Sequence, residues 1–209
     1  MKYLNFNKIL CLSPHPDDVE LGVSGTIIKY QDTQFDILTL SLGGVFEGSN
    51  PMDRRSEVCN AWADVNVKNC KLDFGNLKPE DNSQSKLVNK IETEYLKSDH
   101  DAILVPTWDD SHFEHRKTNE LASALTRCKN ISIIEYRTPS TLHKWTPNIF
   151  IDITDHYDRK LSMLKHFDSQ SNKKYFDKIV LDTFHTDFQS SKKGNKFVEQ
   201  FKLIQLYGK

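Results

Sequence analysis

A short polar turn after an apolar run carries side chains that can bind a divalent metal ion. The apolar run is residues 9–12, and residues 13–20 read Ser-Pro-His-Pro-Asp-Asp-Val-Glu. Two prolines stiffen this turn, and His15, Asp17 and Asp18 supply one imidazole and two carboxylates. Such groups are zinc ligands, and one carboxylate can stay free to move a proton. The turn is therefore predicted to supply most of a zinc site in a metal-dependent hydrolase.

A second polar cluster lies far along the chain, where residues 109–116 read Asp-Asp-Ser-His-Phe-Glu-His-Arg. His112 and His115 project from one side if a helix starts there. Catalytic zinc takes three protein ligands and keeps one position open for water. His15 and Asp18 can supply two ligands, and one histidine of the second cluster can supply the third. The spacing leaves open which histidine it is.

Both clusters follow apolar strands, so in a parallel sheet they would lie at the same edge. Asp17 would then be free to take a proton from the attacking water and to hand it to a leaving amine. The spare histidine could donate to the oxyanion of a tetrahedral intermediate. Taken singly, such residues are more often surface or helix-capping groups, but the two clusters together favour metal binding.

Two motifs resemble signatures of a known family. Residues 14–22, with Ser-Gly-Thr at 24–26, resemble the opening signature of the LmbE-like (PIG-L) zinc-dependent N-deacetylases. Residues 110–116 are similar to that family's second signature, Asp-x-His-Pro-Asp-His-Arg. Residues 54–57, Arg-Arg-Ser-Glu, resemble its Arg-x-x-Glu helix start, and residues 150–154, 169–170 and 197–201 resemble late elements of the family.

The resemblance implies a role for each candidate residue. His15, Asp18 and His115 would be the zinc ligands. Asp17 would be the general base, and His112 would stabilise the oxyanion. Arg54 would contact the substrate, with the neighbouring Arg55 as the other candidate. The sequence departs from the family pattern where Val19 precedes Glu20 and where Phe113-Glu114 replaces Pro-Asp, and neither change removes a ligand.

The family's usual reaction removes acetyl from an N-acetylglucosamine unit. The resemblance therefore implies hydrolysis of an N-acetyl group on an amino sugar or glycoconjugate, with release of acetate and a free amine. The implied cofactor is Zn²⁺, although other divalent transition metals such as Fe²⁺ suit the same ligands. The alternatives are a metal-dependent amidase or esterase acting on a non-sugar substrate and a non-catalytic sugar-binding module. The module predicts a lost ligand or base, and none is lost.

Composition narrows the class of partner. The chain has 209 residues and a net charge of −1, so no bulk charge favours nucleic acid or a membrane surface. The expected partner is a small amino-sugar or glycoconjugate substrate, and homo-oligomer formation stays open. The first residues hold no long apolar segment, so we expect no signal peptide and a cytoplasmic location. The four cysteines form no Cys-x-x-Cys pair and are expected to be free thiols.

Apolar runs and helical periodicity alternate along the chain. They predict strands at 8–13, 35–42, 70–74, 102–105, 131–136 and 149–153. They predict helices at 19–30, 52–64, 86–96, after the second cluster, from 154 or 155 to 167, and at 175–188. Residues 197–207 suit either a strand or a short helix. We expect a Rossmann-like, doubly wound, mostly parallel α/β sheet with helices on both faces, in a single domain over 1–209.

Three local questions depend on packing. Gly22 and Gly25 lie inside a helical pattern, which favours close packing of that helix on the sheet over a phosphate-binding loop. Asp110 or Ser111 is expected to cap the helix that follows the second cluster. Trp108 or Trp145 could form an aromatic platform for a sugar, and a core role suits either one equally well.

Overall fold

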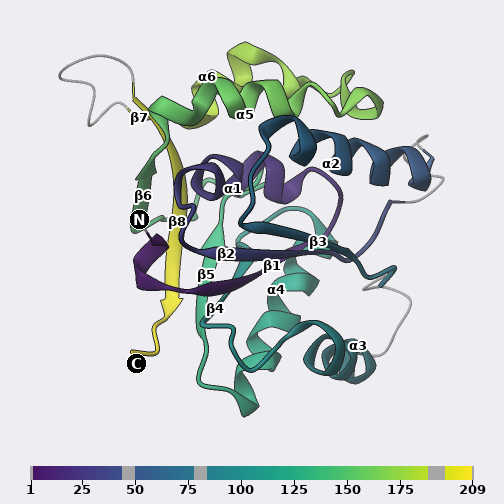
Figure 1. The fold of residues 1–209 in the computed structure, drawn as a ribbon, viewed down its shortest axis with the longest axis vertical. Helices are drawn as coiled ribbons and strands as arrows, with labels where there is room; N and C mark the ends of the chain where they lie inside the picture. The colour runs from purple at the N-terminus through teal and green to yellow at the C-terminus, as the bar shows by residue number, and fades with distance from the viewer. Residues whose placement is uncertain (1, 44–49, 78–83, 188–195, 209) are drawn as a thin grey trace.

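The computed structural model describes residues 2–43, 50–77, 84–187 and 196–208, without the side chain of Cys128. One sheet runs through these residues in the order β3-β2-β1-β4-β5-β8-β6, with β7 paired to β8 (Figure 1). The strands are β1 (Lys8–Ser13), β2 (Gln34–Thr39), β3 (Cys70–Phe74), β4 (Ala102–Pro106), β5 (Ser132–Tyr136), β6 (Ile149–Asp152), β7 (Thr186–Asp187) and β8 (Lys196–Gln205).

The first five strands are parallel, and the later ones add an antiparallel edge. β1 pairs in parallel with β2 and with β4, while β8 runs antiparallel to both β5 and β6. The chain passes from β1 to β2 and β3 on one side and then crosses to β4 on the other. Ligands bind at the carboxyl ends of strands beside such a reversal. The predicted mostly parallel, doubly wound fold is confirmed, and residues 197–207 are mainly strand.

Helices cover both faces of the sheet (Figure 1). One face carries α1 (Asp18–Lys29), α2 (Pro51–Val65) and α5 (Tyr157–Leu164), with α6 (Lys178–His185) in the same layer. The other face carries α3 (Gln84–Lys90) and α4 (Phe113–Leu125). Side chains of β1 alternate between two cores, with Ile9 and Cys11 in one and Leu10 and Leu12 in the other. This double burial explains why the strands read as continuous apolar runs.

Two glycines let α1 lie close to the sheet. A Cβ at Gly22 would come within 2.6 Å of the carbonyl oxygen of Arg137 and 2.7 Å of the Tyr136 ring. A Cβ at Gly25 would come within 2.7 Å of Ile153. Larger side chains at these positions would push α1 away from the sheet. This confirms the packing interpretation of both glycines.

A buried ion pair fixes α1 to the last strand. Lys160 of α5 donates from Nζ to Glu199 Oε1 at 2.5 Å and to the carbonyl oxygen of Leu21 at 2.6 Å. Glu199 also accepts the backbone N–H groups of Gly25 and Thr26 at 2.8 and 2.7 Å. Both charged side chains are fully buried. The ammonium and the carboxylate thereby bind backbone groups of α1 from Leu21 to Thr26.

The later helices are shorter than the periodicity predicts. The segment expected as one helix to residue 167 is a 3-10 turn, Thr154–His156, followed by α5. The helix expected over 175–188 is a 3-10 turn, Lys174–Phe176, then α6 and β7, and residue 188 lies outside the described residues. Extended backbone at Asp177 separates the turn from α6. β8 pairs with residues 186–187 and draws them out of the helix.

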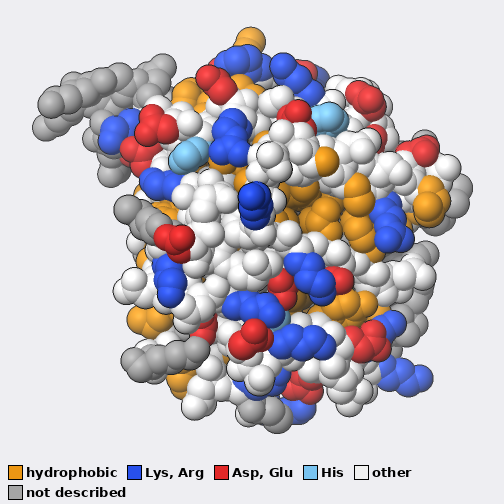
Figure 2. Space-filling view, in the orientation of Figure 1, with side chains coloured by type: hydrophobic (Ala, Val, Ile, Leu, Met, Phe, Trp, Pro, Cys, Tyr) orange, Lys and Arg blue, Asp and Glu red, His pale blue; other side chains and the backbone are white. Residues whose placement is uncertain are grey.

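The surface carries charges of both signs. Figure 2 shows basic and acidic side chains interspersed over the visible face, without one continuous patch of either sign. Within the described residues, no helix combines the length and the apolar character needed to cross a membrane. The cysteines whose side chains are described, Cys11, Cys59 and Cys70, are free thiols.

Candidate metal and active site

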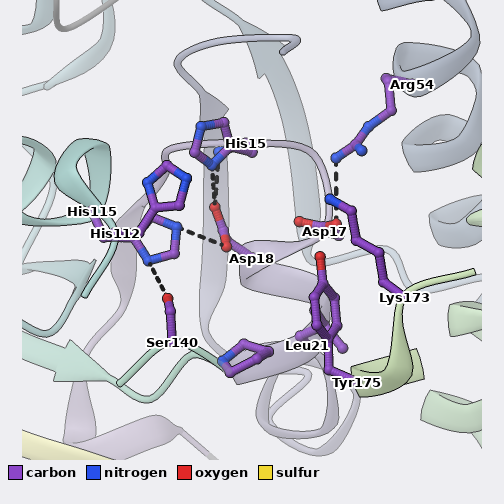
Figure 3. A pocket seen from close by; sticks show the side chains of 11 residues that line it. His15, Asp17, Asp18, Leu21, Arg54, His112, His115, Ser140, Lys173 and Tyr175 are labelled. Carbon is purple, nitrogen blue, oxygen red and sulfur yellow. Dashed lines mark hydrogen bonds and ion pairs between the residues drawn. The ribbon is translucent and has the colours of Figure 1, made fainter. Parts of the chain in front are cut away.

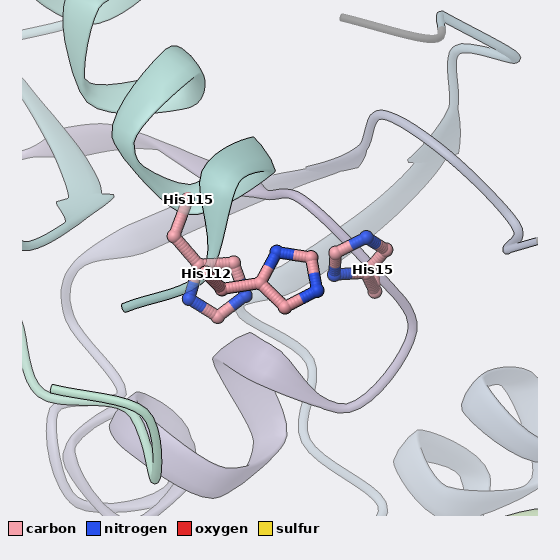
Figure 4. Close-up of side chains that lie close together, drawn as sticks. All are labelled: His15, His112 and His115. Atoms are coloured by element: carbon pink, nitrogen blue, oxygen red, sulfur yellow. The ribbon is translucent and has the colours of Figure 1, made fainter. Parts of the chain in front are cut away.

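Three histidines from two distant segments meet at the carboxyl edge of the sheet. His15 lies in the turn after β1, while His112 and His115 lie at the start of α4 (Figure 4). One ring nitrogen from each lies within 4.8 Å of the other two. The rings of His112 and His115 are stacked with centroids 4.7 Å apart. The parallel sheet thus brings the two polar clusters together.

Asp18 lies between two of these imidazoles. Its Oδ2 is 3.2 Å from Nδ1 of His15, and its Oδ1 is 3.2 Å from Nε2 of His115 (Figure 3). Two ligands bound tetrahedrally at zinc–ligand distances of about 2.0–2.1 Å lie roughly 3.3 Å apart. The two separations and the nitrogen and oxygen donors therefore fit the ligand set of a zinc ion.

The electrostatics of this group favour a positive charge at its centre. Burial alone would lower the pKa of His15, but Asp18 and Glu114 raise it to about 10. Burial acts in the same direction on His115, whose pKa Asp18 and Asp110 raise to about 9. The imidazoles in turn hold the pKa of Asp18 well below its ordinary value, against the effect of burial. Surrounding carboxylates thus attract either protons or a metal cation.

Glu114, one of the two residues that replace Pro-Asp of the family pattern, contacts His15. Its Oε2 contacts Nε2 of His15, on the side of the ring away from Asp18. His15 therefore lies between two carboxylates. Glu114 belongs to the first turn of α4, and this contact joins the helix to the turn after β1.

His115 is oriented from behind by Asp110. Oδ2 of Asp110 lies 3.1 Å from Nδ1 of His115 and accepts the hydroxyl of Thr138 at 2.5 Å. A carboxylate behind a histidine fixes the orientation of the ring and the nitrogen that faces a metal. The expected cap at Asp110 or Ser111 is therefore wrong: His112 occupies the N-cap, and its Nδ1 accepts the Glu114 N–H at 3.3 Å.

Asp17 is buried beside the histidine cluster, in an unusual backbone conformation. Its φ is 113°, in the region that favours glycine, and its backbone N–H donates to Glu20 Oε2 at 3.1 Å. Burial raises the pKa of Asp17 to about 7, and the neighbouring Asp18 adds to this effect. Arg54, His15 and Lys173 oppose the increase. A carboxyl group with a pKa near neutrality is suited to both accept and return a proton.

Arg54 reaches this carboxylate from α2. Its side chain is 1% exposed, and Nη2 lies 3.3 Å from Asp17 Oδ2 while also donating to the carbonyl oxygen of Pro16. Arg55 instead lies over the ring of Phe74, 4.7 Å from its centroid, and is exposed. Of the two arginines named from the sequence, Arg54 is the one that turns toward the site.

These side chains line a cavity of about 190 Å³ (Figure 3). The six candidate residues all belong to its wall, and sequence reasoning missed the others: Leu21, Pro139, Ser140, Lys173 and Tyr175. Lys173 directly precedes the 3-10 turn Lys174–Phe176, and Tyr175 lies in it. The sequence placed Tyr175 at the start of a predicted helix over 175–188, and for the residues just before Lys173 its signal was the resemblance at 169–170. The cavity is smaller than typical drug-sized sites, so it suits a small group or one ring of a substrate.

Neither Trp108 nor Trp145, the two candidates for an aromatic platform, lines this cavity. Trp145 is buried and donates from Nε1 to Glu135 at 3.1 Å. Trp108 is half exposed and borders a separate hollow with Phe113. Of the described aromatic side chains, Tyr175 is the one, besides the histidines, that reaches the cavity wall.

Comparison with known proteins is consistent with this fold and site. Residues 10–126 match the PIG-L family, described as GlcNAc-PI de-N-acetylase. Diacetylchitobiose deacetylase of Thermococcus kodakarensis is 30% identical over 191 residues, which cover 78% of this chain and 70% of that protein. The N,N′-diacetylchitobiose deacetylase of Pyrococcus horikoshii has a TM-score of 0.72 at 25% identity, covering 97% of this chain and 85% of that one.

The fold and the site define an α/β protein with a histidine–carboxylate cluster at the carboxyl edge of its sheet. The chain belongs to the PIG-L family. The 4-carboxy-2-hydroxymuconate hydratase of Pseudomonas putida has the same fold, with a TM-score of 0.73 at 14% identity over 100% of this chain and 98% of that one. Because a hydratase shares the fold, the reaction must be argued from the site.

Proposed function

We propose that this protein is a metal-dependent N-deacetylase that releases acetate from an N-acetylated amino sugar or glycoconjugate. The observation that carries the proposal is the position of Asp18 between His15 and His115, with the buried carboxyl group of Asp17 beside them. Family membership and the diacetylchitobiose deacetylase relatives support an amino sugar over the non-sugar amide or ester that the same side chains could serve.

We assign His15, Asp18 and His115 as the residues that hold the metal. Two imidazoles and one carboxylate are the ligand types of catalytic zinc, and Fe²⁺ suits the same donors. When bound, the metal would make water more acidic and polarise the acetamide carbonyl. The ligand set is complete in this chain, which favours an enzyme over a non-catalytic sugar-binding module.

Asp17 would act as the general base. Its carboxylate takes a proton from the attacking water and returns it to the leaving amine nitrogen, so that acetate and a free amine are released. A pKa near 7 suits both steps. Arg54 holds the carboxylate in place at 3.3 Å and would contact the substrate at the same wall of the cavity.

His112 would stabilise the oxyanion. Burial and the neighbouring His115 and His15 lower the pKa of His112, so the ring is neutral near pH 7. Because Nδ1 accepts the Glu114 N–H, the ring proton is assigned to Nε2, which is then a donor toward the carbonyl oxygen of the substrate. The competing role is that of a third histidine ligand, which the ring's distance from His15 and His115 also allows.

The remaining assignments concern the whole chain. We propose that residues 1–209 form one deacetylase domain, because β8, near the end of the chain, pairs with β5 in the same sheet. The substrate is a small amino sugar or glycoconjugate, as the diacetylchitobiose deacetylase relatives suggest. Zn²⁺ is the metal that we assign.

The deciding experiment compares the wild-type protein with Asp17→Asn and His115→Ala. Metal content is measured by elemental analysis, and acetate is measured after incubation with a panel of N-acetylated sugars and conjugates. We expect Asp17→Asn to retain metal and to lose acetate release by roughly 10²- to 10⁴-fold. His115→Ala should lose metal. Full acetate release by both variants would refute the assigned roles.

A further inference from the structure

Glu20 is a buried acidic residue to which the proposed reaction gives no role. It lies in the first turn of α1, and its side chain is 1% exposed. Its Oε2 accepts the backbone N–H of Asp17 at 3.1 Å, and its Oε1 accepts Nε1–H of Trp62 at 2.7 Å. Burial of a carboxylate is costly without such donors. The two N–H groups, one from the turn after β1 and one from α2, therefore account for a charged side chain at this place.

The contact between Glu20 and Asp17 differs from an ordinary helix cap. In a capping box, a glutamate in the first turn reaches back to the backbone N–H of the N-cap residue, and that residue is normally extended. Glu20 and Asp17 have this arrangement, but the φ of Asp17 is 113°. A non-glycine residue keeps such a conformation only where its surroundings hold it. Glu20 binds the nitrogen of the bond about which φ turns, so its carboxylate is placed to hold this conformation.

The backbone conformation of Asp17 decides where its carboxyl group lies. A change of φ from 113° to an ordinary negative value would rotate Cβ and the carboxyl group about the N–Cα bond. In its present place the carboxyl group lines the cavity, and its Oδ2 lies 3.3 Å from Nη2 of Arg54 (Figure 3). A displacement of a reacting group by about 1 Å can lower a rate by roughly 10²-fold. The hold on this backbone therefore bears on the reaction as well as on the fold.

Helix α2 holds the turn after β1 at two points. Arg54 contacts the carboxylate of Asp17 and the carbonyl oxygen of Pro16. Trp62, about two helical turns later, binds Glu20. Both Arg54 and Trp62 lie on the buried face of α2. One helix thus holds the side chain of Asp17 through Arg54, and its backbone through Trp62 and Glu20.

We propose that Glu20 and Trp62 are positioning residues, which hold Asp17 in the conformation that directs its carboxyl group into the cavity. Trp62 fixes the Glu20 side chain, and Glu20 fixes the backbone N–H of Asp17. Neither Glu20 nor Trp62 belongs to the cavity wall, so both act through Asp17. This inference rests on the proposed function for the role of Asp17 as general base. The competing interpretation is that the two bonds serve folding alone, in which case their loss would lower stability without changing kcat.

Substitutions that keep side-chain volume test this role on the metal-loaded protein. Glu20→Met keeps the length of the side chain but removes both carboxylate oxygens. Trp62→Phe keeps an aromatic ring but removes Nε1–H. Trp145→Phe is the matched control, because Trp145 is also buried and donates from Nε1 to a buried glutamate, Glu135, at 3.1 Å. Steady-state kinetics of acetate release, metal content and urea unfolding are measured for each variant and for the double variant of Glu20 and Trp62.

A positioning role predicts a loss in kcat alone. We expect kcat to fall roughly 10- to 100-fold in Glu20→Met and in Trp62→Phe, while KM and metal content stay at the wild-type values. The double variant should lose no more than Glu20→Met, because Trp62 acts through Glu20. Trp145→Phe should lose stability and keep its kcat. Wild-type kcat in both single variants would overturn the inference, as would losses that multiply in the double variant or an equal loss in Trp145→Phe.

A crystal structure of Glu20→Met gives a result that does not depend on catalysis. We expect the φ of Asp17 to leave the positive region and its carboxylate to move out of reach of Arg54. A φ that stays near 113° would overturn the inference. If Glu20→Met does not fold, the structure and kinetics of Trp62→Phe decide in the same way. If the wild type releases acetate from no N-acetylated sugar, the proposed function fails, and the crystal structure still decides whether Glu20 holds the Asp17 backbone.

Discussion

Glu20 accepts the backbone N–H of Asp17 at 3.1 Å, and Asp17 has a φ of 113°. The Glu20 side chain is held in turn by Nε1 of Trp62 at 2.7 Å. A non-glycine residue in such a region costs about 1–3 kcal/mol and persists when its surroundings hold it there. Asp17, at the start of α1, is therefore a strained residue. A glycine would fit this backbone without strain, but it would lack the carboxyl group that lines the cavity.

Two substitutions of Asp17 separate the effect of backbone strain on stability from the effect of the carboxyl group on acetate release. Asp17→Gly and Asp17→Ala both remove the buried carboxyl group, but only glycine adopts the observed φ freely. We expect Asp17→Gly to be more stable to unfolding by urea than Asp17→Ala, by about 1 kcal/mol. Neither variant should release acetate. A more stable alanine variant would show that the backbone at this position is not strained.

Asp110 provides a test of the support behind His115. Asp110→Asn should lower metal affinity by roughly 10- to 100-fold, because the amide no longer holds the ring as a carboxylate does. The control is Asp109→Asn, since Asp109 pairs with the exposed Lys144 at 2.8 Å, and such surface pairs contribute little. Competition with a chelating dye measures both affinities. Equal losses in the two variants would remove Asp110 from the metal site.

The position of the first cluster could be predicted because a buried parallel strand ends at a known edge. The run before His15 is apolar on both faces, so it had to be a central strand, and its carboxyl end had to face the ligand. The same argument placed His115 after β4. The cap of α4 could not be predicted in this way, because Asp110, the better capping residue, is used by His115 and Thr138 instead.

The opposite wall of the cavity could not be predicted from local patterns. Lys173 lies in a segment without helical or strand periodicity, and its position depends on the contact between Glu57 and Ser169 across the fold. The helix predicted over 175–188 is also shorter in the structure, where α6 covers Lys178–His185. Ile179 is 80% exposed, so the apolar periodicity there did not mark a buried face.

His112 can be distinguished as an oxyanion donor or as a metal ligand. Because Asp18 lies between His15 and His115, which we assign as the metal ligands, we expect His112→Ala to retain one metal ion per chain. Its kcat for acetate release should fall roughly 10²- to 10³-fold, as on loss of one oxyanion-hole donor. Metal analysis and steady-state kinetics measure both. Loss of metal in step with His115→Ala would make His112 a ligand.

Metal binding should release protons from the site. In the metal-free protein, the pKa values of His15 and His115 are raised from 6.5 to about 10 and about 9, so both rings are protonated near pH 7.5. A metal ion needs their lone pairs, so binding should displace up to two protons and should tighten as pH rises. Calorimetry in buffers of different ionisation enthalpy counts the protons. A value near zero would contradict the assignment of these ligands.

The same two groups set how the stability of the metal-free protein depends on pH. A histidine whose pKa is raised on folding binds more protons in the folded state than in the unfolded state. Its contribution to the free energy of unfolding is therefore fully present below about pH 6.5 and is lost as pH rises through about 9 to 10. Urea unfolding in the presence of a chelator should show this loss. His115→Ala should show a shallower loss over the same pH range, because one of the two titrating rings is gone.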